Sequence, residues 1–246
     1  MHPTDYLIAN WQVPNNIHAI TTYRTGGNSQ SVYSSFNLAS HVGDNSDTVL
    51  QNRQQLMQLL NLPNAPIWLN QTHSNTAVRA QTSAQPINAD ASYSNQAGVV
   101  CAVLTADCLP VALCSTDGQQ IAAIHAGWRG LADGIISNTV AALRVDNPKA
   151  EFIAWLGPAI GTKQFEVGAE VREVFVAQSQ DNALAFKARE NKWLADIYQL
   201  ARRELNALGI HAVYGGGLCT VSDSEHFYSY RRDKQTGRMA TLIWRS

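Results

Sequence analysis

The chain has 246 residues, of which 45% are hydrophobic and only 15% are charged, and its formal net charge is -1 at pH 7. This length and apolar content can form a sizeable buried core, and the lack of a Lys/Arg cluster longer than a pair argues against nucleic acid and anionic membranes as partners. No apolar run approaches the ~18 residues of a membrane span, and the N-terminus lacks a basic start followed by an apolar stretch, so we expect a cytoplasmic protein.

Candidate strands occur along the whole chain as short apolar runs. In order, they are IHAITTY, PIWLN, GVVCAVL, PVALC, IAAIH, EFIAWLG and HAVYG. They alternate with helical patterns, and no repeat, low-complexity tract or linker separates them. This organisation predicts a single α/β domain over residues 1–246, with mixed β-sheets flanked by helices.

Three helices are predicted between these strands. The first covers residues 48–60, after the Asp and Ser residues of GDNSD, and the second covers residues 128–143, where apolar residues form one stripe. The third begins near Trp193 in WLADIYQLARRELNALG, and Gly209 stands where a C-terminal cap belongs. We expect these helices to supply packing contacts.

The runs PVALC and IAAIH are separated by STDGQ, a polar segment with an Asp-Gly pair, and they predict a β-hairpin. With STDGQ as the loop, Cys114 pairs with Gln120 and His125 lies opposite Leu109. Because Cys108 directly precedes Leu109, Cys108 and His125 meet at the open end of the hairpin, where neighbouring side chains are roughly 5 to 8 Å apart. They are close enough to share a metal ion.

A third metal ligand has to come from elsewhere in the chain. His73 follows IWLNQ and lies at a predicted strand tip, and His41 in NLASHVGD is the next candidate. One Cys and two His with a vacant position are typical of catalytic zinc, whereas structural zinc has four protein ligands. The full set of remaining histidines is His2, His18, His41, His73, His211 and His226.

The cysteines also exclude some classes of protein. Three of the four lie in apolar segments and no CxxC pair occurs, so we expect reduced thiols and no disulfide framework, zinc ribbon or thioredoxin-like motif. Directly after His125 the chain reads AGWRG, at the start of the second predicted helix. A helix start with glycines and an arginine suits an anion.

Eight motifs of this chain resemble, in order, those of the YfiH or laccase-domain family, which is also called polyphenol oxidase or peptidoglycan editing factor. The resemblance covers residues 24–246. The motifs are RTGG (24–27), NLASHVGDN (37–45), THS (72–74), TADCLPV (105–111), HAGWRG (125–130), WLGPAIG (155–161), FEVG (165–168), and SYRRD with TGRMA (229–240).

The resemblance implies a layered α/β/β/α domain, similar to bacterial toxin deamidase domains that use a Cys and a His. It also implies that His73, Cys108 and His125 bind one zinc ion. Family members are described as enzymes that phosphorolyse adenosine, inosine, guanosine and methylthioadenosine and that deaminate adenosine. The family usually has glycine where this chain has Ser74, and a serine would be strained there if its φ were positive.

These activities give further residues candidate roles. Asp107, beside Cys108, is the candidate acid/base for deamination by zinc-activated water. Arg24 and Arg129 are candidates for phosphate, since one guanidinium can hold two phosphate oxygens. The candidates for ribose or base contacts are Asn37, His41 and Gln71.

Three alternatives stay open. A copper oxidase could use the same three ligands for one copper ion, although seven histidines without a His-x-His pair are too few for coupled copper clusters. A metal-free hydrolase acting on a peptidoglycan precursor could use Cys108 as nucleophile and His125 as base. A non-catalytic zinc domain would have a closed coordination shell. The sequence does not reveal the oligomeric state.

Overall fold

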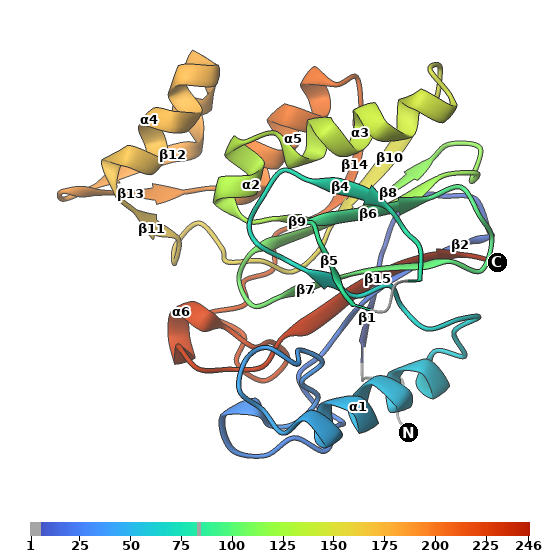
Figure 1. Ribbon diagram of the computed structural model, residues 1–246. Coiled ribbons are helices and arrows are strands. Elements are labelled where there is room, and N and C mark those ends of the chain that lie inside the picture. The colour runs from blue at the N-terminus through green and yellow to red at the C-terminus, as the bar shows by residue number, and fades with distance from the viewer. Residues whose placement is uncertain (1–5, 83–84) are drawn as a thin grey trace.

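The computed structural model describes residues 6–82 and 85–246, so His2 lies outside the described residues. Two β-sheets are stacked face to face, with helices on the two outer faces (Figure 1). This is the layered α/β/β/α arrangement expected from the family resemblance. In the part of the chain that the structure describes, no helix has both the length and the apolar character needed to cross a membrane.

The first sheet has four strands, and every neighbouring pair is antiparallel. In spatial order the strands are β1 (Tyr6–Ile8), β2 (Ile17–Thr22), β15 (Met239–Arg245) and β7 (Val100–Thr105). Helix α1 (Ser46–Leu59) lies below this sheet in Figure 1. The side chain of Asn45 caps α1 by accepting a hydrogen bond from the backbone N–H of Thr48 (3.0 Å).

The second sheet has six strands and is mixed. In spatial order they are β14 (Ala212–Gly215), β10 (Phe152–Leu156), β8 (Leu109–Ser115), β9 (Ile121–Ala126), β6 (Ala91–Ser94) and β4 (Ala77–Arg79). The β10/β14 and β4/β6 pairs are parallel and the others antiparallel. Its outer face is covered by α2 (Trp128–Ala132), α3 (Ile135–Asp146) and α5 (Ile197–Ala207) (Figure 1).

The remaining elements are small. A three-stranded sheet and α4 (Ala169–Gln178) project from one side of the molecule (Figure 1). The strands of that sheet are β11 (Glu166–Val167), β13 (Lys192–Ala195) and β12 (Phe186–Arg189); β3 (Leu69–Asn70) and β5 (Ile87–Asn88) form a two-stranded sheet. The short helices are α6 (Tyr230–Asp233), η1 (Ser31–Tyr33) and η2 (Gln180–Ala185).

The central strands are apolar throughout because both of their faces are covered. Along β9, Ile124 packs toward the helices, whereas Ile121 and Ala123 pack between the two sheets. Along β7, Val103 packs between the sheets and Leu104 packs toward α1. Alternate residues of one apolar run thus belong to different layers of the core.

All seven predicted strands contain observed strand residues, but two of the three predicted helices differ from the structure. The predicted helix over 128–143 is wrong as one element, because Gly134 has φ +82° and divides it into α2 and α3. The helix predicted from Trp193 begins instead at Ile197, since residues 192–195 pair as β13 and Asp196 caps the helix. Gly209 is left-handed, with φ +80°, as predicted for a C-terminal cap.

A candidate metal centre in a cationic and apolar cavity

Three segments bring His73, Cys108 and His125 together. His73 lies on the loop after β3, Cys108 on the turn between β7 and β8, and His125 within β9. One candidate ligand atom from each residue lies within 4.8 Å of the other two, and Cys108 Sγ is 3.7 Å from His73 Nε2. The hairpin register predicted that Cys108 and His125 lie close together, and the family resemblance added His73 to them.

The predicted register of the hairpin is one residue out. Cys114 pairs with Ile121, and His125 pairs with Pro110 rather than with Leu109. The turn is longer than STDGQ alone, because Ser115 Oγ accepts hydrogen bonds from the backbone N–H groups at 119 and 120 (3.1 and 2.9 Å). Cys108 precedes β8 and remains at the open end of the hairpin.

Asp90 is the buried carboxylate that positions two of the three residues. Its Oδ1 accepts hydrogen bonds from His125 Nδ1 (2.7 Å) and the backbone N–H of His73 (3.0 Å). Its Oδ2 accepts from the backbone N–H and Oγ of Ser74 (2.7 Å each) and from the backbone N–H of Thr72 (3.2 Å). The contact with Nδ1 leaves His125 Nε2 free for a metal, the usual role of a carboxylate behind a metal-binding histidine.

Charges within the cluster favour the ionised forms of its members. Burial alone would raise the pKa of Asp90, but hydrogen bonds from His125 and Ser74 hold it well below its usual range. Burial also opposes ionisation of Cys108, yet the charge and hydrogen bonds of His125 and His73 lower the pKa of the thiol to about 6. Burial would lower the pKa of His125, but Cys108 and Asp90 raise it to about 9. The cluster therefore favours the thiolate form of Cys108.

Two glycines of HAGWRG are required by close packing against the cluster. A Cβ on Gly127 would lie 2.9 Å from His73 Cδ2 and 3.1 Å from Cys108 Sγ. A Cβ on Gly130 would lie 2.8 Å from the backbone oxygen of Ser74. Glycine at both positions lets α2 approach the loop that carries His73.

The backbone is left-handed at two residues of the site. His73 has φ +61° and Asp107 has φ +100°, a region that costs energy for residues other than glycine. Ser74 does not have a positive φ, so the strain considered for a serine at this position does not arise. Its hydroxyl instead supplies one of the hydrogen bonds to Asp90.

The donor set fits a zinc ion or a similar transition metal. Zinc is bound by thiolate and imidazole, and a tetrahedral zinc would separate its sulfur and nitrogen ligands by about 3.5 Å, close to the observed spacing of 3.7 Å. With three protein ligands, the cluster leaves a coordination position for water or substrate. The same donors also suit copper.

The cluster opens into a cavity of about 460 Å³. Apolar side chains cover one part of its wall, among them Trp128, Ile160, Phe165 and Ile197. Among the described residues, the charged ones of the wall, apart from the metal cluster, are three arginines and one carboxylate: Arg129, Arg231, Arg238 and Asp107. The cavity therefore combines apolar surface with an excess of positive charge.

The candidate residues from the sequence divide into two groups. Asp107, His41, Gln71 and Arg129 line the cavity, whereas Arg24 and Asn37 are not among its lining residues. The guanidinium of Arg24 donates to the backbone oxygens of Ser34 and Ser224, and the amide of Asn37 is fully buried and donates to Asp44 Oδ2. The structure gives these two side chains internal bonds and no exposure to this cavity.

Three of the cavity candidates also have structural contacts. Asp107 Oδ1 accepts a hydrogen bond from Thr220 Oγ1 and its Oδ2 accepts from the backbone N–H of Arg231, both at 2.6 Å. A carboxylate has about four acceptor sites, so two remain. Gln71 bonds to both backbone groups of Leu104. Arg129 stacks over Trp128 at 4.3 Å and is exposed, and α2 has only five residues, too few for a strong helix dipole at the anion position predicted there.

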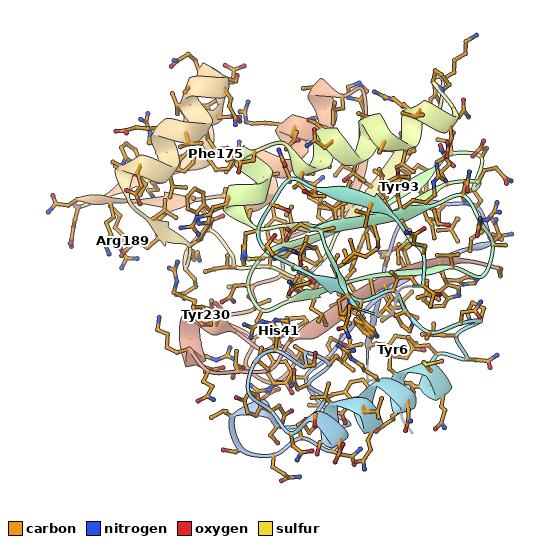
Figure 2. The ribbon with its side chains drawn as sticks, viewed as in Figure 1. Tyr6, His41, Tyr93, Phe175, Arg189 and Tyr230 are labelled. Atoms are coloured by element: carbon orange, nitrogen blue, oxygen red, sulfur yellow. The ribbon has the colours of Figure 1, made fainter. Side chains whose placement is uncertain are left out.

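Residue-level reasoning from the sequence missed the C-terminal part of the cavity. Tyr230, Arg231 and Arg238 line it, on the segment that contains SYRRD and TGRMA. Those motifs carried the family resemblance, but nothing in their spacing indicated proximity to Cys108. Figure 2 shows Tyr230 and His41 on the same side of the molecule, where the segment around α6 meets the loop before α1.

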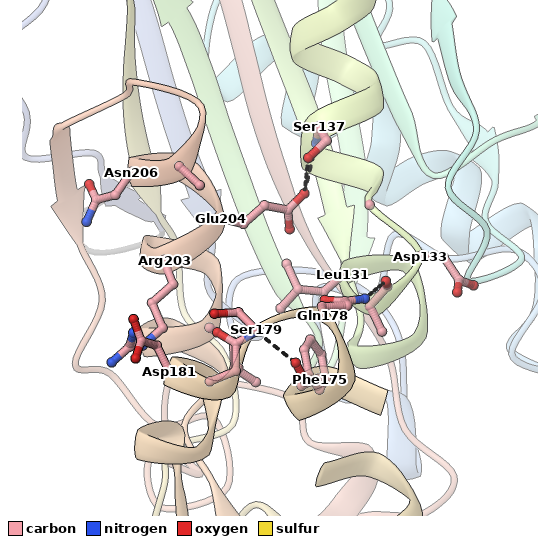
Figure 3. A pocket seen from close by; sticks show the side chains of 15 residues that line it. Leu131, Asp133, Ser137, Phe175, Gln178, Ser179, Asp181, Arg203, Glu204 and Asn206 are labelled. Carbon is pink, nitrogen blue, oxygen red and sulfur yellow. Dashed lines mark hydrogen bonds between the residues drawn. The ribbon is translucent and has the colours of Figure 1, made fainter. Parts of the chain in front are cut away.

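A second cavity, of about 560 Å³, lies between α2, α4 and α5 (Figure 3). In it Glu204 accepts hydrogen bonds from the backbone N–H (2.9 Å) and Oγ (2.7 Å) of Ser137, and so caps the start of α3. Burial raises the pKa of Glu204. The described residues that line this cavity include no histidine or cysteine, and its carboxylate serves a helix end.

A family model described as multi-copper polyphenol oxidoreductase laccase matches residues 18–246. The chain belongs to this family. It is 50% identical over 238 residues to a protein of Haemophilus influenzae named purine nucleoside phosphorylase, covering 96% of this chain and 97% of that protein. It is 48% identical over 241 residues to purine nucleoside phosphorylase YfiH of Escherichia coli K12, covering 97% and 98% of the two chains.

Solved structures of the family have the same fold. A Neisseria meningitidis protein superimposes with a TM-score of 0.93 at 46% identity, over 99% of this chain and all of that one. YlmD from Geobacillus stearothermophilus also gives a TM-score of 0.93, at 27% identity, over 100% of this chain and 97% of that one. The layered fold is thus common to relatives that differ in most of their residues.

Proposed function

We propose that this protein is a metal-dependent purine nucleoside phosphorylase. The observation that carries the proposal is the juxtaposition, in one cavity, of the three-residue metal cluster, an apolar wall and three arginines that outnumber the single carboxylate among the described wall residues. Relatives that are 48 to 50% identical over almost the entire chain are named purine nucleoside phosphorylase, which supports an enzyme of this kind.

The proposed reaction exchanges one bond at the sugar. An oxygen of inorganic phosphate forms a bond to C1′ of the ribose as the bond from C1′ to the purine nitrogen breaks. The purine leaves with the bonding electron pair and takes up one proton, and the sugar leaves as its 1-phosphate. Positive charge develops on the sugar in the transition state, by analogy with other glycosidic cleavages.

The residues of the cavity have distinct parts in this reaction. The apolar side chains Ile160, Phe165 and Ile197 provide a surface for the flat purine and exclude water from it. Asp107 keeps acceptor capacity and is the candidate to exchange a proton with the substrate or to balance charge on the sugar. Gln71 is the remaining polar candidate for the nucleoside, although both ends of its amide already bond to Leu104.

His73, Cys108 and His125 would hold the metal, which we propose is zinc. When bound, such an ion supplies Lewis-acid polarisation and lowers the pKa of a coordinated water toward neutrality. Asp90 fixes the orientation of His125 and the loop of His73 whether or not the ion is present.

In finer detail, we propose that adenosine, inosine, guanosine and methylthioadenosine are phosphorolysed, that adenosine is also deaminated hydrolytically, and that the enzyme acts in the cytoplasm. These substrates follow from the family resemblance. An open coordination position supports the deamination, because a metal-activated water is the nucleophile in zinc deaminases.

Oxidation of phenols with copper is a second candidate function, because the family model carries that description. The described residues contain one cluster of at least three candidate metal ligands, enough for a single ion. Coupled copper chemistry requires additional histidine-rich sites. The copper hypothesis is therefore restricted to a mononuclear centre on the same ligands.

Metal analysis of protein purified without added metal, combined with chromatography of products from adenosine and phosphate, tests the proposal. We expect one zinc per chain, release of adenine that depends on phosphate, and formation of inosine. Absence of bound zinc together with absence of both products would refute the proposed function. His73→Ala should release the metal, and unchanged zinc content would mean that His73 is not a ligand.

A further inference from the structure

The metal cavity adjoins another depression, and we call the part of the wall that the two share the neck. The depression has a volume of about 370 Å³ and shares three wall residues with the metal cavity: His41, Tyr230 and Arg238. Lys234 also lines it, and the described residues of its wall include no Asp or Glu. On the side of the depression a small anion would meet Lys234, and on the side of the metal cavity it would meet Arg129 and Arg231 together with the carboxylate Asp107.

Arg238 is the cation best placed to bind an anion at this neck. Its side chain is half-buried, and no carboxylate among residues 6–82 and 85–246 lies within ion-pair distance of it. Nη1 donates to the backbone oxygens of Thr236 (2.8 Å) and Gly237 (3.0 Å), which fixes the plane of the guanidinium. No hydrogen bond to the described residues engages its Nε or Nη2, so one edge of the group is available.

The backbone of Arg238 is also held in place. Its N–H donates to the buried side-chain oxygen of Asn37 at 3.0 Å, and the amide of Asn37 donates to Asp44 Oδ2 at 2.9 Å. Asn37, a candidate for substrate contact from the sequence, thus positions Arg238 from behind the cavity wall. A held guanidinium loses little conformational entropy when it binds a ligand.

The other arginines of the cavity are less suited to this task. Both terminal nitrogens of Arg231 donate to backbone oxygens, of Gln164 (3.0 Å) and Glu166 (3.2 Å). Arg129 is exposed and stacks on Trp128. Partial burial, and after it the charges of Arg238 and Arg53, lower the pKa of His41.

We infer that Arg238, assisted by His41, binds the phosphate co-substrate at this neck, between the metal cavity and the second depression. The inference rests on the proposed function for the identity of the anion, and it deepens that function by naming the subsite. It places phosphate on one side of the cavity and leaves the apolar wall for the purine.

Binding of inorganic phosphate to the zinc-loaded protein, measured by calorimetry without nucleoside, tests the inference directly. Loss of charge-assisted hydrogen bonds in Arg238→Gln should weaken phosphate binding by roughly tenfold to hundredfold. Arg238→Lys keeps the charge but loses the fork and should give an intermediate affinity. Arg79→Gln, a change of the same charge at an exposed arginine paired with Asp146, should bind phosphate within twofold of wild type.

Kinetics provide a second readout. In Arg238→Gln the KM for phosphate should rise by a factor similar to the loss of affinity, while the KM for the nucleoside and the zinc content stay within twofold of wild type. His41→Gln should raise the KM for phosphate by a smaller factor. Thermal unfolding shows whether each variant is folded, and Arg238→Lys serves as the test if Arg238→Gln is not.

The outcomes separate this inference from the proposed function. Phosphate binding that is absent in the wild type, or unchanged in both Arg238 variants, overturns the inference. Phosphate binding that depends on Arg238 without any phosphorolysis refutes the proposed function but supports the anion subsite. A rise of the nucleoside KM equal to that for phosphate overturns the inference, because it would indicate general damage to the cavity.

Discussion

Replacement of Asp90 by asparagine should separate metal binding from folding. Asparagine has the shape of aspartate but only one side-chain oxygen. Its NH2 group must therefore face the hydrogen-bond donors that now contact either Oδ1 or Oδ2 of Asp90. On the Oδ2 side these are backbone N–H groups of Thr72 and Ser74, which cannot become acceptors. On the Oδ1 side one partner is His125 Nδ1, which can become an acceptor by moving its proton to Nε2.

That tautomer shift would block the nitrogen that faces the metal. We therefore expect Asp90→Asn to weaken metal binding by about 10- to 100-fold. Two hydrogen bonds to a charged acceptor, from His125 and His73, are lost or altered, each worth about 1.5 to 3 kcal/mol, so the free energy of unfolding should fall by about 3 to 6 kcal/mol. Chelator competition measures the first quantity and urea unfolding of the metal-free protein the second.

Asn52→Ala is the matched control, because Asn52 is also a fully buried polar residue, with bonds to Ser29 and Asn37, but it does not line the metal cavity. It should lower stability and leave metal affinity unchanged. Metal affinity within twofold of wild type in Asp90→Asn would refute the role assigned to Asp90.

Wild type and Asp90→Asn should also differ in how the free energy of unfolding depends on pH. Because the folded state lowers the pKa of Asp90, its stabilising contribution is complete above the unfolded value of about 3.9 and is lost as the pH falls through the lower folded value. The stability difference between wild type and Asp90→Asn should be constant between about pH 5 and about pH 6.5 and shrink below about pH 4. It should also shrink as the pH rises toward about 9, because His125, whose pKa Asp90 helps to raise, then loses its proton.

Further predictions concern the close contacts and the thiol. Gly127→Ala would place a methyl group 2.9 Å from His73 Cδ2, so chelator competition should show at least a tenfold (about 1.4 kcal/mol) loss of metal affinity. Metal affinity equal to that of the wild type would contradict the packing argument. In a Cys219→Ser background, Cys108 should be alkylated rapidly at pH 7.5 once metal is removed, because its pKa is lowered to about 6. Bound metal should protect it. Equal alkylation rates of the metal-free and metal-bound proteins would indicate that Cys108 is a free nucleophile. Ser74→Gly removes the Oγ hydrogen bond to the buried carboxylate and should lower the free energy of unfolding by about 1 to 3 kcal/mol, measured by urea denaturation. A gain in stability would contradict the role assigned to this hydrogen bond.

Local pattern was sufficient for much of the fold. The apolar runs identified the central strands, because strands covered on both faces must be apolar at every position. The Asp-Gly pair after PVALC identified the hairpin, and its register was one residue out because a side chain, Ser115 Oγ, extends the turn. The single helix over 128–143 failed for a reason visible only in the backbone, the left-handed conformation of Gly134.

The sequence by itself determined that Cys108 and His125 meet, because 17 residues of hairpin allow few other arrangements. It did not determine the partners that arrive from distant segments. Asp90 and Arg238 are 35 and 113 residues from His125. Asp90 reaches it when β6 pairs with β9, and Arg238, which directly precedes β15, reaches the cavity only when the two sheets stack. Contacts of this kind depend on tertiary packing, since local periodicity specifies which face of an element is buried but not which distant residue lies against it.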